Sequence, residues 1–230
     1  MSGLRVVSLV PSVTETLLAW GIDVVGCTRF CEQPQLPHVG GTKDPDVDAI
    51  VALSPDLVVV DEEENRFPDA EAIIARGLQL HVTHVTRLAD VPATLAALAT
   101  AVGADAVPVA LPPAAVRHAE ACVLIWRRPW MTVNADTYGS TVLDHLGIGN
   151  VFADAQDRYP TVTIEEIEAQ APALVLLPTE PYAFKQRHVD ELRAALPAAD
   201  VRLIDGADLF WWGVRTPEAL RRLSVELTGP

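Results

Sequence analysis

Aromatic and arginine side chains gather in two segments of the sequence. Four of the five tryptophans lie within Trp126–Trp130 and Phe210–Trp212. Flat aromatic side chains provide large contact areas for a planar or macrocyclic ligand. Arg127, Arg128 and Arg215 stand beside them and could pair with carboxylates or phosphates on such a ligand. Tryptophan is about as often buried in a protein core, so the pattern indicates a binding site without establishing one.

Acidic residues form a second pattern. Asp61–Glu64 are four consecutive acids, and such a run is most often a solvated loop. Another acid, Glu180, lies 117 residues after Glu63, and the segments that precede the two acids match at the same offset. Acids at equivalent places in two similar lobes could dock a basic partner or line the rim of a ligand cleft.

Patterns for catalysis or metal binding are weak. Cys27, Cys31 and Cys122 are too few for a disulfide framework, and two thiols alone do not complete a zinc site. His81 and His84 are three residues apart on an expected strand, so their side chains point to opposite faces. The sequence also lacks a glycine-rich phosphate loop and a serine nucleophile elbow. We therefore predict no catalytic residue, no metal site, no intrinsic cofactor and no enzyme activity.

The composition excludes several classes of partner. The 230 residues contain 17 Lys and Arg against 31 Asp and Glu, a net charge of −14. Nucleic acids and anionic membranes attract clustered cations, so neither is an expected partner. No apolar run has the length that a membrane span needs. The N-terminus lacks a basic and apolar leader pattern, which predicts a cytoplasmic protein, or a periplasmic or cell-surface one if a leader was removed.

Apolar runs of strand length alternate with helical patterns, which is typical of an α/β fold with parallel sheets. The expected strands are Arg5–Val10, Ile22–Gly26, Asp56–Val60, Leu78–Val85 and Val123–Trp126. The expected helices are Ser12–Trp20, Asp46–Leu53, Pro68–Arg76 and Asp90–Val102. Ser12 and Glu15 fit a capping box at the start of the first helix, and this helix start could also bind an anion.

The second half of the chain repeats the first. Thr14–Ile22 resembles Ser140–Ile148 at an offset of 126 residues, and Ala49–Val60 resembles Glu166–Leu177 at an offset of 117. Two matches in the same order predict two similar α/β lobes with a ligand cleft between them. We place the N-terminal lobe at residues 1–88, a connecting helix and linker at 89–121, and the C-terminal lobe at 122–230. Gly103 and the prolines after it shorten the connecting helix.

An ordered set of motifs across nearly the whole chain resembles a known family. The segments that carry the resemblance are Val7–Glu15, Val39–Lys43, Ile50–Val58, Glu63–Arg66, Asp136–Tyr138 and Trp212–Pro217. The sequence is similar to the class III periplasmic substrate-binding proteins of ABC importers, which include binders of vitamin B12, ferric siderophores and haem. It is most similar to the branch called helical backbone metal receptors.

The resemblance implies two Rossmann-like lobes with parallel sheets, joined by a rigid connecting helix, with the ligand held between them. It implies that an acid on each lobe docks arginines of an ABC permease, here Glu63 or Glu64 and Glu180. The ligand-binding residues that it implies are Arg29, Phe30, Trp126, Trp130, Tyr138, Tyr182, Trp211, Trp212 and Arg215.

The leading functional hypothesis is a binding protein for a cobalamin-like ligand, with a ferric siderophore or haem next. The first alternative is a cytosolic enzyme or chaperone that acts on such a ligand in the same cleft, with Cys31, Glu15 or Glu63 taking part. The second alternative is an interaction protein that uses its acidic loops on a basic protein surface.

Overall fold

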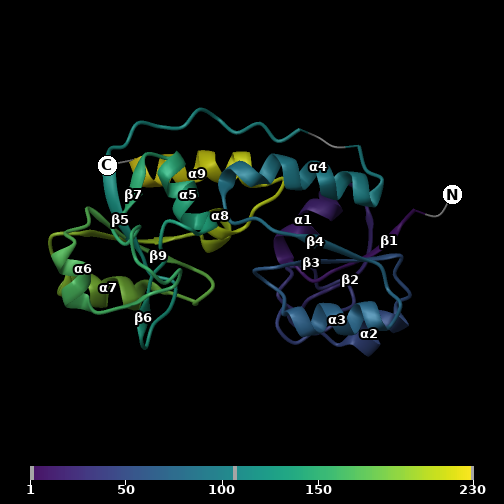
Figure 1. Cartoon of the computed structure of the whole chain (residues 1–230). Coiled ribbons are helices and arrows are strands. Elements are labelled where there is room, and N and C mark those ends of the chain that lie inside the picture. The colour runs from purple at the N-terminus through teal and green to yellow at the C-terminus, as the bar shows by residue number, and fades with distance from the viewer. Residues whose placement is uncertain (1–2, 106–107, 229–230) are drawn as a thin grey trace. The chain divides into compact units, whose positions relative to one another are not determined.

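The computed structural model describes residues 3–105 and 108–228, and these form two compact units (Figure 1). The N-terminal unit contains the described residues of Met1–Val85, Ala89–Ala110 and Trp212–Thr216. The C-terminal unit contains those of Thr86–Leu88, Leu111–Trp211 and Pro217–Pro230. A short segment from near the C-terminus, Trp212–Thr216, is therefore part of the N-terminal unit.

The N-terminal unit is built on a four-stranded parallel sheet. Its strands are β1 (Arg5–Ser8), β2 (Asp23–Cys27), β3 (Leu57–Asp61) and β4 (Leu80–Thr83), in the spatial order β2-β1-β3-β4. The central strands β1 and β3 are buried over most of their length, as their unbroken apolar runs predict.

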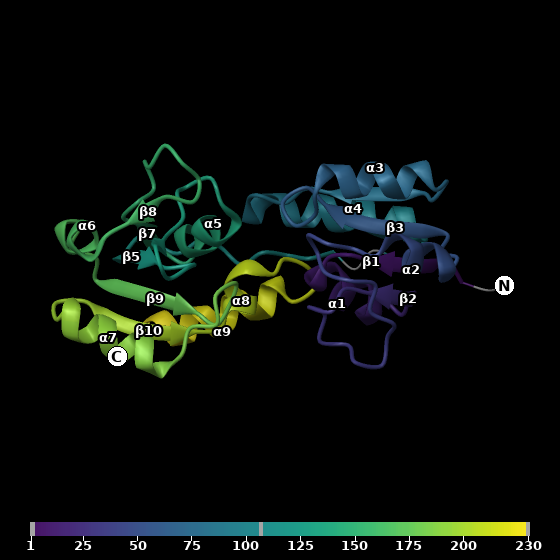
Figure 2. The same ribbon diagram turned by 90° about the horizontal axis from the view of Figure 1, so that it is seen from below.

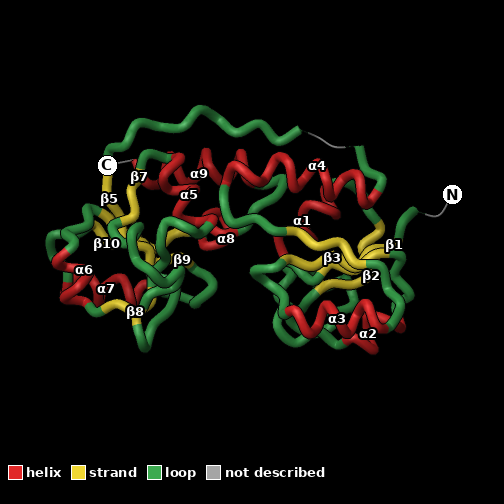
Figure 3. Tube along the Cα trace, viewed as in Figure 1, coloured by secondary structure: helices red, strands yellow, loops and turns green. Residues whose placement is uncertain are grey.

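Helices cover both faces of this sheet. They are α1 (Pro11–Ala19), α2 (Val47–Ala52), α3 (Phe67–Ala75) and α4 (Val91–Val102), with a 3₁₀ turn at Leu88–Asp90. Figure 3 shows the strands of this unit between α1 and α4 on one side and α2 and α3 on the other. Ile50 of α2 and Ile73 of α3 pack with Val7 and Val58 of the sheet in one fully buried cluster.

The C-terminal unit has the same plan. Its parallel sheet contains β5 (Ala119–Val123), β7 (Ile148–Asn150), β9 (Leu174–Pro178) and β10 (Asp200–Ile204), in the order β10-β9-β5-β7. Figure 2 shows β9 and β10 side by side. The two-residue strands β6 (Trp130–Met131) and β8 (Thr161–Val162) form a separate antiparallel pair.

The helices of this unit are α5 (Tyr138–His145), α6 (Ile164–Ala169), α7 (Gln186–Ala195), α8 (Gly206–Phe210) and α9 (Thr216–Thr228). Ile167 of α6 and Leu192 of α7 pack with Val175 and Leu177 of β9 in a buried cluster, which places both helices on one face of the sheet. The two lobes with parallel sheets that the sequence predicts are confirmed.

The strand orders also show that the two units share one topology. In each sheet the first strand lies beside the third, with the second strand on one outer edge and the fourth on the other. The repeat extends to backbone detail. Ser54 and Ala171, which are 117 residues apart, each precede a proline and have left-handed φ values of 49° and 47°. The residue after each short helix therefore turns the chain into β3 or β9 in the same way.

Two expectations about element boundaries are wrong. The helix α1 begins at Pro11 after Val10, without a side-chain cap, so Ser12 and Glu15 form no capping box. A proline in the first helical position has no N–H group that needs a cap. The strand expected at Val123–Trp126 is β5 at Ala119–Val123. Charged Glu120, which pairs with Arg117, hides the start of this strand from an apolar pattern.

The helix expected at Asp90–Val102 is confirmed as α4. It ends at Gly103, whose φ of 67° is a left-handed C-cap conformation that glycine adopts without strain. The described residues 108–118 that follow belong to neither helix nor strand.

The repeated left-handed turn gives a stability prediction. A side chain costs about 1–2 kcal/mol in this conformation, whereas glycine costs about 0.5–1 kcal/mol in chain entropy. We expect Ala171→Gly to stabilise the C-terminal unit by about 0.5 kcal/mol, measured by urea unfolding. Ala169→Gly, two residues earlier in α6, is the matched control and should cost about 1 kcal/mol. Destabilisation by both changes would contradict the argument.

Candidate functional site

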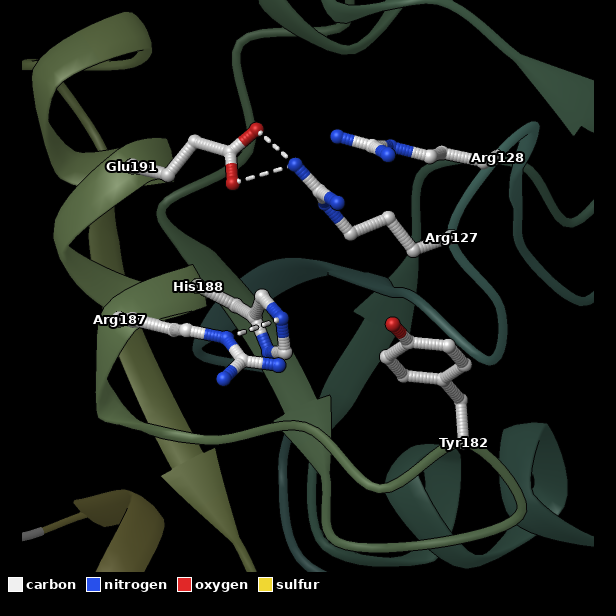
Figure 4. Close-up of a pocket in the computed structure, with 6 residues that line it drawn as sticks. All are labelled: Arg127, Arg128, Tyr182, Arg187, His188 and Glu191. Carbon is white, nitrogen blue, oxygen red and sulfur yellow. Dashed lines mark hydrogen bonds and ion pairs between the residues drawn. The ribbon is translucent and has the colours of Figure 1, made fainter.

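An open pocket of about 580 Å³ lies where β5 and β9 end in the C-terminal unit. From β5 the chain continues to one side of the sheet, and from β9 it continues to the other. Such a switch point leaves a crevice outside the carboxyl ends of two neighbouring strands, and ligands of open α/β sheets bind there. The pocket is lined by Arg127, Arg128, Tyr182, Arg187, His188 and Glu191 (Figure 4).

The segment after β5 forms one wall of the pocket. Trp126 and Met131 form an isolated antiparallel bridge, so the chain between them is a tight turn. Arg127 and Arg128 lie on this turn, and Arg128 has a left-handed φ of 68°. The turn therefore carries two adjacent guanidinium groups at the end of the central strand.

An aromatic cluster includes Tyr182, whose ring lines the pocket. Tyr182 lies between Trp126 and Phe184, with ring centroids 5.3 and 4.7 Å away. The Trp130 ring stacks on Phe184 at 6.1 Å with an interplanar angle of 13°. The structure thus brings three of the expected ligand residues, Trp126, Trp130 and Tyr182, into one cluster, and Trp126 remains 44% exposed.

Charge around the pocket is positive. Both Glu191 carboxylate oxygens accept from Arg127 Nη2, at 2.7 and 2.8 Å, and the Arg127 guanidinium lies 5.4 Å from the Trp130 ring centroid. Arg128 and Arg187 are exposed. Figure 4 shows the three guanidinium groups and the Tyr182 hydroxyl around one space. Three arginines against one glutamate make a local cationic site in a chain of net charge −14.

His188 holds the first turn of α7 in place. It is 2% exposed, and its Nδ1 accepts a hydrogen bond of 3.0 Å from the backbone N–H of Lys185. Burial lowers the pKa of His188, and the nearby positive charge of Arg187 and Arg127 lowers it further. A neutral imidazole accepts at only one nitrogen. The Arg187 Nε–H, which points at Nε2 from 3.2 Å, therefore gains little there, and this guanidinium remains available for an anion.

Sequence reasoning missed Arg187, His188 and Glu191. All three lie in the first six residues of α7, the helix that follows the Glu180 loop, and residues 187 and 191 have the i, i+4 spacing of one helix face. This spacing could have indicated that Arg187 and Glu191 share one face of a helix. Only the strand order shows that α7 starts beside the loop after β5.

The other expected site residues lie elsewhere. Arg29 donates to both carboxylate oxygens of Asp44, at 3.0 and 3.1 Å, and its guanidinium lies 4.9 Å from the centroid of the half-exposed Phe30 ring. Both belong to the loop after β2 in the N-terminal unit. Tyr138, at the start of α5, is 8% exposed, and Trp211 is partly buried after α8.

Trp212 and Arg215 belong to the N-terminal unit, where Arg215 contacts α1. Trp212 is 5% exposed, and Arg215 Nε lies 2.9 Å from Glu15 Oε2. The backbone N–H of Val214 donates to Thr16 Oγ1 at 3.3 Å. A Cβ on Gly213 would lie 2.3 Å from the same oxygen, so only glycine allows this approach. Glu15 thus serves as the partner of Arg215.

The acidic loop after β3 is an ordered turn. Asp61 is 2% exposed and accepts from Thr83 Oγ1 at 2.8 Å and from the Glu63 backbone N–H at 2.9 Å. Asn65 closes the turn by donating to the carbonyls of Leu9 and Thr42. Glu63 is half-buried and Glu64 is exposed, while Glu180 is half-buried in the loop after β9. The acids of the expected docking pair therefore follow equivalent strands.

Across residues 3–105 and 108–228, no group of three or more His, Cys, Asp or Glu side chains is placed to hold a metal ion. None of the helices in that part of the chain is long and apolar enough to cross a membrane.

Comparison with known proteins supports the family resemblance. Residues 6–107 match the family described as periplasmic binding protein. The vitamin B12-binding protein of Salmonella choleraesuis (strain SC-B67) is 25% identical over 190 residues, 75% of this chain and 71% of its own length. That of Yersinia pestis (strain Pestoides F) is 24% identical over 192 residues, 75% of this chain and 69% of its own length.

Solved structures match nearly the whole chain. The periplasmic vitamin B12-binding protein BtuF of Vibrio cholerae has a TM-score of 0.76 and 19% identity, covering 98% of this chain and 96% of that one. The periplasmic heme-binding protein RhuT from Roseiflexus sp. RS-1 has a TM-score of 0.79 and 22% identity, covering 97% of each chain. The resemblance to the class III periplasmic substrate-binding proteins is confirmed, and this chain has their fold.

The Glu15–Arg215 pair gives a second prediction. Because both side chains are partly buried and paired, we expect Arg215→Ala and Glu15→Ala each to destabilise the ligand-free protein, with a coupling energy of about 1 kcal/mol in a double-mutant cycle. Thermal and urea unfolding would measure it. Unchanged stability in Arg215→Ala would assign this arginine to ligand contact alone.

Asp61 gives a prediction about pH. Burial raises the pKa of Asp61 above its usual value. Between the usual and the raised pKa, the folded protein keeps a proton that the unfolded chain has released, so this group stabilises the fold less as pH rises. Asp61→Asn carries no such proton. We therefore expect the variant to be more stable than the wild type at neutral pH, with an advantage that shrinks in acid.

Urea-unfolding midpoints of both proteins over a pH series would test this expectation. A difference between them that stays constant with pH would contradict it.

Proposed function

We propose that this protein binds an anionic metal complex of the haem, ferric-siderophore or corrinoid class, and that the pocket after β5 and β9 holds the acidic groups of that ligand. The observation that carries the proposal is the convergence of three arginines on one aromatic cluster at the switch point of a parallel sheet. The names of the relatives support the same class, because they bind vitamin B12 or heme.

The arginines favour a ligand that carries carboxylates or phosphates. Guanidinium groups bind such groups through paired, charge-assisted hydrogen bonds. Arg127 is fixed by Glu191 and by Trp130, whereas Arg128 and Arg187 are exposed. The ligand would therefore contact one guanidinium group that is held in place, that of Arg127, and two whose side chains can change conformation. This favours haem, with its propionates, and acidic ferric siderophores over a corrinoid.

The aromatic residues favour a ligand with a broad flat face. Trp126 is 44% exposed beside the Tyr182 ring, so it offers an apolar surface next to the charged groups. An amphipathic ligand could place its ring system on Trp126 and its acids on the arginines.

We also propose that Glu63, Glu64 and Glu180 dock this protein on a basic surface, such as an ABC permease. Support comes from the equivalent places of Glu63 and Glu180 after β3 and β9 and from the high negative charge of the chain. Docking on an importer requires a location outside the cytoplasm, which is the location in the names of the structural relatives. The cytoplasmic location predicted from the N-terminus stays a prediction.

Tryptophan fluorescence provides the test. The protein would be titrated with haem, a carboxylate ferric siderophore and cobalamin, with Trp126 and Trp130 as reporters. We expect saturable quenching, tightest with haem or the siderophore. Because one charge-assisted hydrogen bond contributes about 1.5–3 kcal/mol, Arg128→Ala and Arg187→Ala should each weaken binding roughly tenfold or more.

Arg221→Ala is the matched control. Arg221 is exposed on α9 of the same unit, where it pairs with Glu218, so its loss should leave the affinity unchanged. Absence of saturable quenching by all three ligands would overturn the proposal. Recovery of the ligand unchanged after binding would distinguish a binding protein from an enzyme that acts on it.

A further inference from the structure

The cysteines Cys27 and Cys31 meet at the end of β2. Cys27 is the last residue of the strand, and the chain then turns back, with the Cys31 N–H donating to the carbonyl of Thr28 at 3.1 Å. Backbone hydrogen bonds to Pro37 and Val39 hold Cys27 on the other side. In this arrangement each thiol lies close enough to the other to shift its pKa.

Hydroxyl groups surround the Cys31 sulfur. Thr14 Oγ1 lies 3.3 Å from Cys31 Sγ and Thr28 Oγ1 lies 3.4 Å from it. The neighbouring Cys27 thiol lowers the pKa of Cys31, and both threonine hydroxyls lower it further, whereas Cys31 raises the pKa of Cys27. Cys31 is therefore the nucleophile of the pair, because the thiolate is the reactive form.

The third cysteine shows the opposite environment. Cys122 is fully buried in β5, and burial raises its pKa to about 12. Its thiol donates to Thr132 Oγ1 at a distance of 4.0 Å. Cys122 can therefore serve as an internal control for thiol reactivity, because it has neither a partner cysteine nor an activating environment.

We propose that Cys27 and Cys31 form a redox-active dithiol that closes to a reversible intramolecular disulfide. The thiolate of Cys31 attacks one sulfur of a small disulfide such as oxidised glutathione, and one glutathione thiolate leaves. Cys27 then gives up its proton to solvent and attacks Cys31 Sγ, which expels the mixed glutathione. Two protein thiols are oxidised, and one glutathione disulfide is reduced to two thiols.

Burial fixes the order of these steps. Cys27 is 0% exposed and Cys31 is 5% exposed, so the oxidant reaches Cys31 first. The neighbours of Cys31 along the loop, Arg29, Phe30 and Glu32, are exposed, so little buried surface is lost when the loop opens. The disulfide would then tie this loop, with Arg29 and Phe30, to the end of β2.

Peptide mapping of the intact protein tests the proposal directly. The reduced protein would be treated with oxidised glutathione, alkylated and digested with trypsin without reduction. Cleavage after Arg29 separates the two cysteines, so a disulfide joins Val6–Arg29 to Phe30–Lys43 in one linked peptide. We expect this peptide to form and to disappear on reduction, with Cys122 alkylated throughout.

Variants separate the two steps. Cys31→Ser should abolish the linked peptide, whereas Cys122→Ser should leave it unchanged. Cys27→Ser should stop at a stable glutathione adduct on Cys31, because no second thiol is present to expel the glutathione. Glutathione on Cys31 without the linked peptide in the wild type would overturn the proposal, as would oxidation of Cys122 at the same rate. The readout does not depend on ligand binding, so it stands apart from the proposed function.

Discussion

The direction in which each connection leaves the central strands governs the structure of both units. Parallel strands cannot be joined by tight turns, so each must be followed by a crossover on one side of the sheet or the other. In both sheets the connections from the two central strands leave in opposite directions. The loops after β1 and β3, and those after β5 and β9, therefore diverge from the ends of these strands. The side chains that line the C-terminal pocket owe their positions to this divergence.

The same frame carries different chemistry in its two copies. After β3, buried Asp61 and Asn65 lock a turn that presents acids, while after β9 the chain presents Tyr182 and then α7 with Arg187. The matched backbone at Ser54 and Ala171 shows that the frame is retained where the side chains differ. Stability is therefore supplied by the buried strands and their helices, which leaves the strand-end loops free to differ in charge.

Sequence patterns located most elements, because buried parallel strands and helix stops leave strong local signals. The apolar run after Pro55 and the glycine at position 103 are examples, and the ends of β3 and α4 fall within a residue or two of expectation. The capping box at Ser12 and the start of β5 were wrong, because a proline and an ion pair altered the local pattern. Trp126, Trp130 and Tyr182 were predicted from the sequence as separate ligand-binding residues. Their meeting with Arg187 and His188 depends on strand order, which no local pattern encodes.

Arginine and cysteine show how neighbours decide what one residue type does. Arg215 is held by Glu15 on α1, whereas Arg187 faces a neutral histidine that offers it no good acceptor. Cys122 is surrounded by apolar strand residues, whereas Cys31 has a thiol and two hydroxyls around its sulfur. The paired arginine and the neutral buried thiol stabilise the fold, whereas the exposed arginine and the thiol with the lowered pKa are able to bind or react. Function in this chain is therefore best sought where a charge is positioned but not neutralised.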